Sequence, residues 1–453
     1  MSINSKLQSA LAALKGAGAD FADIYFEIAS SHSYSFDDGT FEEISSSNSE
    51  GVGARVLRKD GTAMAHAPGV LLSTAFDCLR KASGELGGVL PQGGGSPVRV
   101  MDREAPLPSP DFSFFSPLDR RIRNGSMWVK QVSMNLSTLA KSFTVFTSDG
   151  VLAGDRRKYT YFSVEVVVEK DGVIQTGYES EARALPSRET FASFSPQKTA
   201  ERALSRALLM LDAPECPAGS MPVLLSGEAG GTMVHEACGH GLEADIIQKD
   251  YSVYRDRIGC RVASPLVTLV DDGSLPGFLG SSAWDDEGTP CGRTVLIDKG
   301  ILKGYLTDIT SARRGNLPLT GNGRRSSYRA VPQPRMTNTF IEPGTSSLED
   351  MIRSMDRGLL VKKMGGGEVN PTSGDFVFQV TEGYLVEGGK IVSPVRGAVL
   401  TGNGPEALLS IEAVGSDLHF LPGMCGKGGQ NVPVTDGQPS LLLRNIVVGG
   451  SGA

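Results

Sequence analysis

The chain has 453 residues, 40% of them hydrophobic and 21% charged, which is typical of a globular protein with two or three domains of roughly 150 residues each. Its net charge of −7 argues against a nucleic-acid binder, which normally presents a basic face. No stretch approaches the roughly 18 apolar residues of a membrane-spanning helix, and the N-terminus has a helical pattern, unlike a signal peptide. Six cysteines without a Cys-x-x-Cys pair indicate a reduced, cytoplasmic protein.

The first predicted block, residues 1–88, mixes helices and strands. Leu7, Leu11 and Leu14 share one face of a predicted first helix. The Asp-Gly pairs at 38–39 and 60–61 predict hairpin turns. Strands and a second helix are predicted around these turns, with strands at 22–28, 33–36, 41–45, 51–58 and 61–66 and the helix at 70–84.

A linker and a second α/β block follow. Residues 89–115 are rich in glycine and proline, which predicts a linker without regular structure. In the block at 116–218, a helix begins near Ser116. An alternating strand at 162–168 is predicted to turn back at Asp171-Gly172, and the apolar spacing predicts a helix over 196–211.

Residues 219–453 form a third part with a different character. A short buried strand at 221–225 precedes one helix, and mostly strands follow. The 56 glycines of the chain favour a turn-rich β domain over a helical bundle. We therefore predict an α+β fold, in which a mixed α/β N-terminal half precedes a β-rich C-terminal domain that carries one metal-binding helix.

That helix contains the sharpest functional signal. The chain has five histidines, and His235 and His240 lie in one short string, with Glu236 directly after the first. Zinc peptidases use the string His-Glu-x-x-His, which places two imidazoles on one helical face and provides a glutamate as general base. The same residue types predict a metal centre here. The alternative is that both histidines are ordinary helix residues, which their scarcity and the adjacent glutamate disfavour.

The two histidines are one position further apart than in the familiar string. On an ideal α-helix, residues i and i+5 are separated by about 140° and could not share a metal. The helix must therefore widen, as in a π-bulge, or end before His240. Gly239 allows either distortion and Gly241 suits a helix stop, so irregular backbone is predicted between Ala237 and Gly241.

A catalytic zinc takes three protein ligands and keeps one position open for water, so a third ligand must come from elsewhere. Cys425 is favoured by context, because its glycine-flanked segment at 421–430 could bring a thiolate close to a metal as a loop. The chemistry leaves other candidates open: Cys260, Cys291, His419, Glu243 and the acidic run Asp285-Asp286-Glu287. For the acidic run, a loop that orders the site is the preferred interpretation over a second metal centre.

At these residues the sequence resembles the TldD/PmbA family of zinc-dependent peptidases, and in particular its TldD branch. The resemblance implies that zinc is bound by His235, His240 and a cysteine near the C-terminus, here Cys425, with Glu236 as catalytic base. It covers most of the chain and is strongest after residue 222. The segments that carry it include His-Glu-Ala-Cys-Gly-His-Gly-Leu-Glu-Ala-Asp (235–245), Trp-Asp-Asp-Glu-Gly-Thr-Pro (284–290), Thr-Gly-Asn-Gly-Arg-Arg (320–325) and Cys-Gly-Lys-Gly-Gly-Gln (425–430).

The resemblance also implies dimers, either of one chain or of an active and an inactive paralogue, and an association with the trimming of leader peptides and the degradation of small unstructured proteins. We expect one Zn²⁺ per chain and a peptide or unfolded-protein substrate, with no nucleic acid or membrane as partner. Asn322, Arg335 and Tyr384 are candidate substrate-binding donors for the oxyanion. Two alternatives stay open: a non-catalytic zinc-stabilised scaffold, and a metal-dependent amidase with a non-peptide substrate.

Overall fold

The structure is a computed structural model that describes residues 2–59, 61–88, 97–102 and 109–450. Within these residues no helix is long and apolar enough to cross a membrane. The N-terminal half contains α1 (Ile3–Gly16), β1 (Phe21–Asp37), β2 (Thr40–Arg58), β3 (Gly61–Pro68), α2 (Leu72–Glu85), α3 (Phe115–Gly125), β4 (Val129–Thr147), β5 (Leu152–Lys170), β6 (Val173–Arg183), α4 (Ser187–Ser193) and α5 (Pro196–Leu211).

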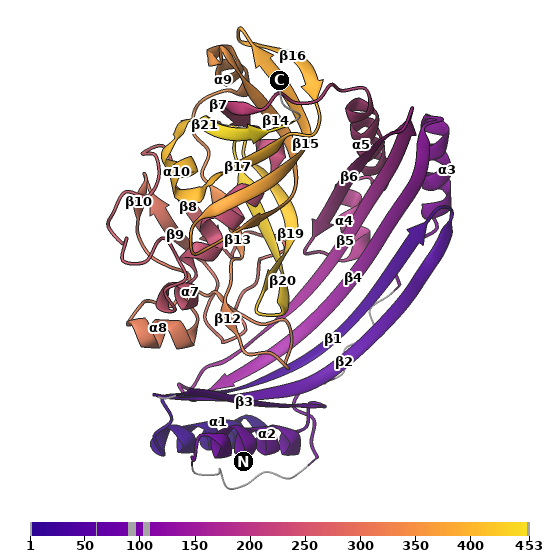
Figure 1. Cartoon of the computed structure of the whole chain (residues 1–453). Coiled ribbons are helices and arrows are strands. Elements are labelled where there is room, and N and C mark those ends of the chain that lie inside the picture. The colour runs from indigo at the N-terminus through magenta and orange to yellow at the C-terminus, as the bar shows by residue number, and fades with distance from the viewer. Residues whose placement is uncertain (1, 60, 89–96, 103–108, 451–453) are drawn as a thin grey trace.

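The C-terminal part is richer in strands, so the predicted α+β class is confirmed (Figure 1). Its helical segments are η1 (Gly227–Ala229), α6 (Thr232–Val234), η2 (His235–Gly239), η3 (His240–Leu242), α7 (Ala244–Gln248), α8 (Ile309–Gly315), α9 (Leu348–Ser354) and α10 (Gly404–Leu409). Its strands are β7 (Gly219–Leu225), β8 (Leu269–Asp272), β9 (Arg293–Asp298), β10 (Ile301–Leu302), β11 (Gly323–Arg324), β12 (Gln333–Pro334), β13 (Asn338–Ile341), β14 (Arg357–Val369), β15 (Asp375–Glu387), β16 (Lys390–Val395), β17 (Val399–Asn403), β18 (Ile411–Val414), β19 (His419–Lys427), β20 (Gln430–Gln438) and β21 (Leu441–Gly449).

The two N-terminal blocks expected from the sequence share one antiparallel sheet, in the order β3-β2-β1-β4-β5-β6. Strands β1 and β2 have 17 and 19 residues and pair along almost their whole length, so the prediction of several short strands here was wrong. The predicted hairpin at Asp171-Gly172 is present, with positive φ at both residues. Part of the predicted linker at 89–115, and Asp60 of the predicted turn at 60–61, lie outside the described residues.

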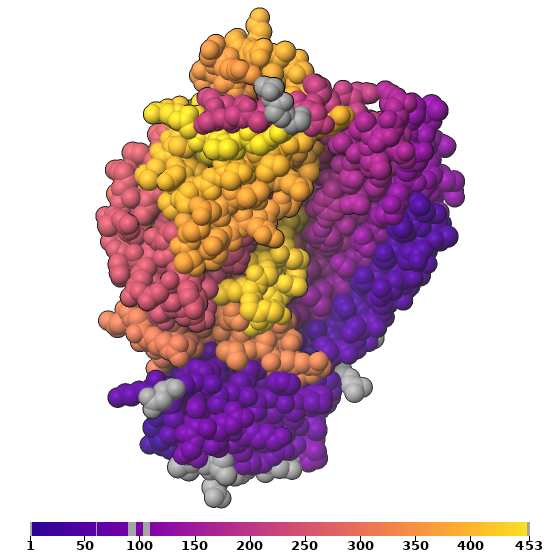
Figure 2. All heavy atoms as spheres, in the orientation of Figure 1, coloured from indigo at the N-terminus to yellow at the C-terminus, as the bar shows by residue number. Residues whose placement is uncertain are grey.

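Helices cover one face of this sheet, and the C-terminal domain lies against the other. Helices α1 and α2 pack on one end of the sheet, and α3 and α5 on the other. The opposite face carries charged residues toward the C-terminal domain, among them Asp23, Arg55 and Arg157. Figure 2 shows the N-terminal half, indigo to magenta, extending along one side of the C-terminal domain and beneath it.

The acidic run 285–287 lies in this contact. Its three carboxylates are buried, and two of them pair with cations of the N-terminal sheet: Arg55 Nη2 is 2.7 Å from Glu287 Oε1, and Arg157 Nη1 is 2.8 Å from Asp286 Oδ1. Backbone amides, including that of Gly323 at 3.0 Å, donate to Asp285. The run thus connects the N-terminal sheet to the C-terminal domain.

Two sheets build the C-terminal domain (Figure 1). One has the order β10-β9-β8-β13-β20-β19, so β19 is an edge strand. In the other, β14-β7-β21-β17-β15-β16, an additional pairing of β14 with β15 closes the sheet on itself. The helical segment at 232–242 is packed in the large apolar core of this domain, together with Cys425 of β19.

Candidate metal centre

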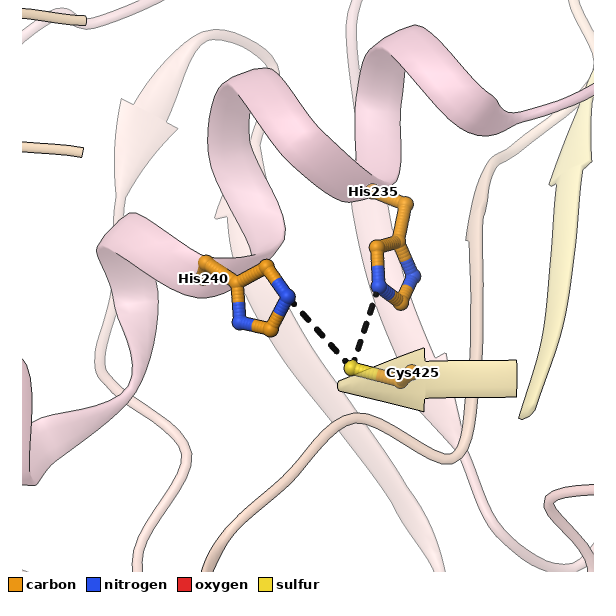
Figure 3. A group of neighbouring side chains, drawn as sticks. All are labelled: His235, His240 and Cys425. Carbon is orange, nitrogen blue, oxygen red and sulfur yellow. Dashed lines mark hydrogen bonds between the residues drawn. The ribbon is translucent and has the colours of Figure 1, made fainter. Parts of the chain in front are cut away.

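The helix that carries the two histidines changes its winding at the first of them. One α-helical turn, α6, leads into the π-helical turn η2 at His235 and then into the 3₁₀ turn η3 at His240. The amide of His240 donates to the carbonyl of His235, five residues back. The predicted irregular backbone is therefore present, and it begins two residues earlier than expected. The wide turn brings both imidazoles to one side of the helix (Figure 3).

Close packing explains why a glycine ends the widened turn. A Cβ on Gly239 would lie 1.9 Å from Sδ of Met336, a fully buried side chain. The helix therefore approaches Met336 as closely as glycine permits. This contact fixes the helix at the position where its two histidines face β19.

The two imidazoles meet the thiol of Cys425 (Figure 3). His235 Nε2 is 3.3 Å and His240 Nε2 is 3.4 Å from Cys425 Sγ. One ligand atom from each residue lies within 4.8 Å of the others, and this is the one group of three or more potential metal ligands found among the described residues. Cys425 lies within strand β19, not in the loop that its glycine neighbours suggested.

A hairpin holds the thiol in place. Strands β19 and β20 pair around the two-residue turn Gly428-Gly429, and Cys425 lies opposite Val432. The buried Arg335 donates to the carbonyl of Cys425 and, at 3.2 Å, to that of Gln430. The backbone on both sides of the hairpin is therefore fixed to the domain core.

Each imidazole also has a carboxylate behind it. His235 Nδ1 donates to Asp436 Oδ1 at 2.7 Å, and His240 Nδ1 donates to Glu243 Oε2 at 3.1 Å. A carboxylate on Nδ1 orients the ring and leaves Nε2 for a metal, which is the common arrangement around ligating histidines. The structure thus places Glu243, a candidate third ligand, behind His240 rather than at the cluster centre.

The pKa values of the cluster reflect strong mutual interaction. Burial alone would raise the pKa of Cys425, but hydrogen bonds from His235 and His240 lower it to about 5. Burial would lower the pKa of His240, but Glu243 and Cys425 raise it to about 10, and Asp436 raises that of His235 well above its usual range. The group therefore holds a thiolate at neutral pH, and a cation that enters it would replace protons on the imidazoles.

The geometry fits a zinc ion. With Zn–N of about 2.1 Å and Zn–S of about 2.3 Å, tetrahedral coordination separates nitrogen and sulfur ligands by about 3.6 Å. The two observed N···S distances, 3.3 and 3.4 Å, are close to this value. Two imidazoles and a thiolate are also ligands that zinc accepts, unlike magnesium or calcium. Three ligands would leave a fourth position open.

Glu236 follows the first histidine and has a half-buried side chain. Within the described residues its carboxylate forms no hydrogen bond or ion pair. This distinguishes it from Glu243 and Asp436, which are each bonded to a histidine. Of these three carboxylates, Glu236 is therefore the one without a hydrogen-bond or ion-pair partner among the described residues.

The other candidate ligands lie elsewhere. His419 is exposed at the start of β19, six residues before Cys425. Cys260 is exposed, and the Cys291 thiol donates to the carbonyl of Gly321. The acidic run 285–287 is paired with the N-terminal sheet, as described above.

The three residues expected to bind substrate face other groups of the protein. Asn322 is buried and donates to Asp271 at 2.7 Å and to the carbonyl of Arg335 at 3.0 Å. Arg335 is fully buried on the hairpin carbonyls. Tyr384 donates to Glu382 at 3.0 Å and packs on a core cluster around α9, apart from the cluster that includes Cys425. In the described structure, the donors of Asn322 and Arg335 are thus engaged inside the protein and the hydroxyl of Tyr384 is engaged with Glu382.

Sequence reasoning missed Asp436 and Lys427. Asp436 is separated from His235 by 201 positions, and no local pattern marks it. Lys427 lies two residues after Cys425 in the Cys-Gly-Lys segment quoted above, and its ammonium contacts Glu243 at 2.9 Å. A charged residue within a glycine-rich, otherwise neutral segment was the available signal.

Comparisons with known proteins cover nearly the whole chain. Family models of the PmbA/TldA metallopeptidases match residues 22–83 (domain 1), 107–211 (central domain) and 218–450 (C-terminal domain). A metalloprotease TldD homologue from Haemophilus influenzae is 38% identical over 449 residues, which is 95% of this chain and 93% of the relative. A zinc metalloprotease TldD homologue from Saccharolobus solfataricus is 35% identical over 234 residues, 51% of this chain and 52% of the relative.

A solved structure has the same fold. TldE from Thermococcus kodakarensis superimposes with a TM-score of 0.76 at 20% sequence identity, covering 98% of this chain and 100% of that protein. At this level of identity the likeness concerns the fold. The β-rich C-terminal region and the long N-terminal sheet thus belong to a fold already seen in solved structures.

Proposed function

The chain belongs to the TldD/PmbA family of metallopeptidases, and we propose that it is a zinc-dependent peptidase that cleaves extended or unfolded peptides and small proteins. His235, His240 and Cys425 would hold one zinc ion per chain. The observation that carries this proposal is the preformed cluster of two imidazoles and one thiol, with Glu236 directly after His235 in the sequence. The naming of the Saccharolobus relative as a zinc metalloprotease supports zinc as the metal.

When bound, zinc supplies a Lewis acid that makes water a nucleophile near neutral pH and polarises the peptide carbonyl. The protein contributes the remaining steps. Asp436 and Glu243 hold the two imidazoles with Nε2 directed at the site. Glu236 accepts the proton of the attacking water and delivers it to the leaving amine. The thiolate of Cys425 would add negative charge to a bound zinc, and a water on that zinc would then be less acidic than in a site of three neutral histidines.

A sheet edge could supply the peptide-binding surface. Strand β19 carries Cys425 and is the outer strand of its sheet. A peptide that adds to such an edge is recognised through its backbone, which suits a broad specificity for extended chains. In the hairpin, Lys427 and Gln430 form the pair that closes the turn. Hydrogen-bonded and non-hydrogen-bonded pairs alternate along an antiparallel hairpin, so the backbone N–H and C=O groups of Met424 and Gly426 point away from β20. Most backbone groups of a folded protein are already paired within its own helices and sheets, so few of its segments can add to this edge.

The arrangement also bears on the two alternatives. A purely structural zinc site is closed by a fourth protein ligand, and the described residues contribute three to this group. An unpaired carboxylate next to the first histidine also has no purpose in such a site. Both observations favour catalysis over a zinc-stabilised scaffold. An amidase with a non-peptide substrate would use the same metal chemistry, and the substrate assay below distinguishes it from a peptidase.

Family resemblance suggests that the enzyme works as a dimer. The solved TldE structure shares the fold over nearly the whole chain. We propose either a homodimer or a heterodimer with an inactive paralogue, and we take a protein of the TldE type as the partner to test. The substrate assay is therefore run with and without a TldE-type partner.

The test uses one substrate protein in two states, native ribonuclease A and its reduced, carboxymethylated form. The zinc-loaded enzyme is expected to cut the unfolded form at many sites and to leave the native form intact. A chelator is expected to abolish cleavage, and one equivalent of zinc to restore it. Mass spectrometry of the digests measures both effects. Cleavage that persists after complete metal removal, or rapid digestion of the native form, would contradict the proposal.

A further inference from the structure

Lys427 is a buried cation near the metal centre that the proposed reaction does not use. It is the last residue of β19, two positions after Cys425, and its side chain is 11% exposed. Its Nζ lies 2.9 Å from Glu243 Oε2, 2.6 Å from Asp245 Oδ1 and 3.0 Å from the carbonyl of Pro334. An ammonium group has three N–H donors, so each donor has an acceptor. The direction of the side chain is therefore fixed.

These acceptors belong to segments that build the site from different parts of the chain. Glu243 and Asp245 directly follow the turn that carries His240, and Pro334 lies in β12 next to Arg335. The Glu243 oxygen that accepts from Lys427 also accepts from His240 Nδ1. One ammonium group thus connects the strand of the thiolate ligand to the carboxylate that orients an imidazole ligand.

The neighbouring contacts of the β19–β20 hairpin do not duplicate the contacts of Lys427 with Glu243 and Asp245. Among the described strands, β19 pairs only with β20, and the hairpin ends in two glycines with positive φ. Arg335 holds the carbonyl of Cys425, but its Nε is 4.0 Å from Glu243 Oε1, beyond hydrogen-bond distance. Lys427 therefore makes the contacts to Glu243 and Asp245 that join the hairpin to the end of the metal helix.

We propose that Lys427 is a positioning residue that sets the separation between the Cys425 thiolate and the His240 imidazole through its contacts with Glu243, Asp245 and Pro334. The proposal rests on the metal site described under the proposed function. Without the ammonium, Glu243 would remain buried with His240 as its one hydrogen-bonding partner, and the carboxylates of Glu243 and Asp245 would repel each other. The hairpin and the helix end would then move apart, and zinc would lose the preformed geometry.

The test compares zinc affinity in Lys427→Met and Lys427→Arg, measured by competition with a chromophoric chelator. Loss of a residue that orients ligands typically costs about 10- to 100-fold in metal affinity, and we expect this for Lys427→Met. Lys427→Arg keeps the charge and the donors and is expected to retain most of the affinity. Lys303→Met is the matched control, because Lys303 forms an exposed pair with Asp298 in the same domain.

A second readout isolates positioning from general stability. In the Co²⁺-substituted protein, the sulfur-to-metal charge-transfer absorption reports the bond to Cys425 and is expected to weaken in Lys427→Met. The loss of affinity is expected to be smaller when Cys425→Ala is already present, because the positioned ligand is then gone. Asp245→Asn, a milder change at a partly exposed side chain, is expected to lose less affinity in the same direction and serves if Lys427→Met does not fold.

The outcomes separate this inference from the metal site itself. If the wild type binds zinc tightly and Cys425→Ala does not, the metal site stands. In that case, the role of Lys427 would be overturned if Lys427→Met kept the zinc affinity and the charge-transfer absorption of the wild type. If Lys427→Met does not fold, the same result in Asp245→Asn would overturn it. An equal loss in Lys427→Met and the Lys303→Met control would overturn it as well. If the wild type binds no zinc, the proposed function and this inference fail together.

Discussion

Replacement of Glu236 with glutamine is expected to lower the rate of peptide hydrolysis by about 10²- to 10⁴-fold, because the variant removes the group that carries the proton from water to the leaving amine. Zinc should remain bound, since the carboxylate of Glu236 is not a hydrogen-bond partner of any of the three ligand side chains in the described structure. The change is nearly isosteric and removes the negative charge without emptying space. The turnover of an unfolded peptide and the zinc content, measured on the same preparation, test this.

A matched variant controls for a general loss of charge near the helix. Glu228 lies on η1, eight positions before Glu236, and forms an exposed pair with Lys362. Glu228→Gln should keep both its zinc and its activity. Wild-type turnover in zinc-loaded Glu236→Gln would remove Glu236 as the base, and the metal would then act with another proton acceptor.

Replacement of Arg55 with methionine is expected to lower the free energy of unfolding by about 3–5 kcal/mol, the usual effect of breaking a buried ion pair. Arg55 has no exposed side-chain surface, and its Nη2 pairs with Asp23 and with Glu287, which are equally buried. Without the guanidinium, these two carboxylates would lose their closest cation at the contact between the N-terminal sheet and the C-terminal domain.

The effect of Arg55→Met on the free energy of unfolding should also depend on pH. Burial raises the pKa of Glu287 above its usual range, although Arg55 lowers it, so the folded state binds a proton more tightly at this carboxyl than the unfolded state does. A raised carboxyl pKa means that stability falls as pH rises between the unfolded value, about 4.5, and the folded value. Removing Arg55 raises that pKa further. The stability deficit of Arg55→Met should therefore be larger at pH 9 than at pH 6.

Denaturant unfolding of the wild type and of Arg55→Met at both pH values provides the measurement. Arg99→Met is the control, because Arg99 pairs with Glu50 at 2.7 Å in the same half of the chain but is about one-third exposed. An exposed pair contributes about 1 kcal/mol or less. Equal deficits in the two variants would show that burial of the Arg55 cluster does not determine its effect.

Local patterns in the sequence predicted local structure well. The apolar period of residues 196–211 matches α5 (Pro196–Leu211), and Asp171-Gly172 forms the expected turn. The long strands of the N-terminal sheet escaped prediction for a physical reason. Residues 30–33 pair with both β2 and β4, yet their side chains are polar and partly exposed, so no apolar alternation marks them as strand.

In the site, too, features set by local sequence could be predicted, whereas features set by tertiary contacts could not. His235 and His240 lie on one short helix, so their approach to one another could be predicted from their spacing together with the need for a widened turn. Asp436 reaches His235 only because β20 passes the helix, which is a tertiary arrangement. Arg335 and Asn322 were selected for their polar side chains, but polarity does not indicate whether a side chain faces a substrate or the protein interior.

The decisive measurement for the metal site is the zinc content of the purified protein. It is compared between wild type, Cys425→Ala and Cys238→Ala after zinc has been offered to each. Cys238 lies in the same helix as the histidines but is buried in the apolar core, where burial raises its pKa to about 12. We expect about one zinc per chain in the wild type and in Cys238→Ala, and a large loss in Cys425→Ala. Full zinc content in Cys425→Ala, or none in the wild type, would contradict it.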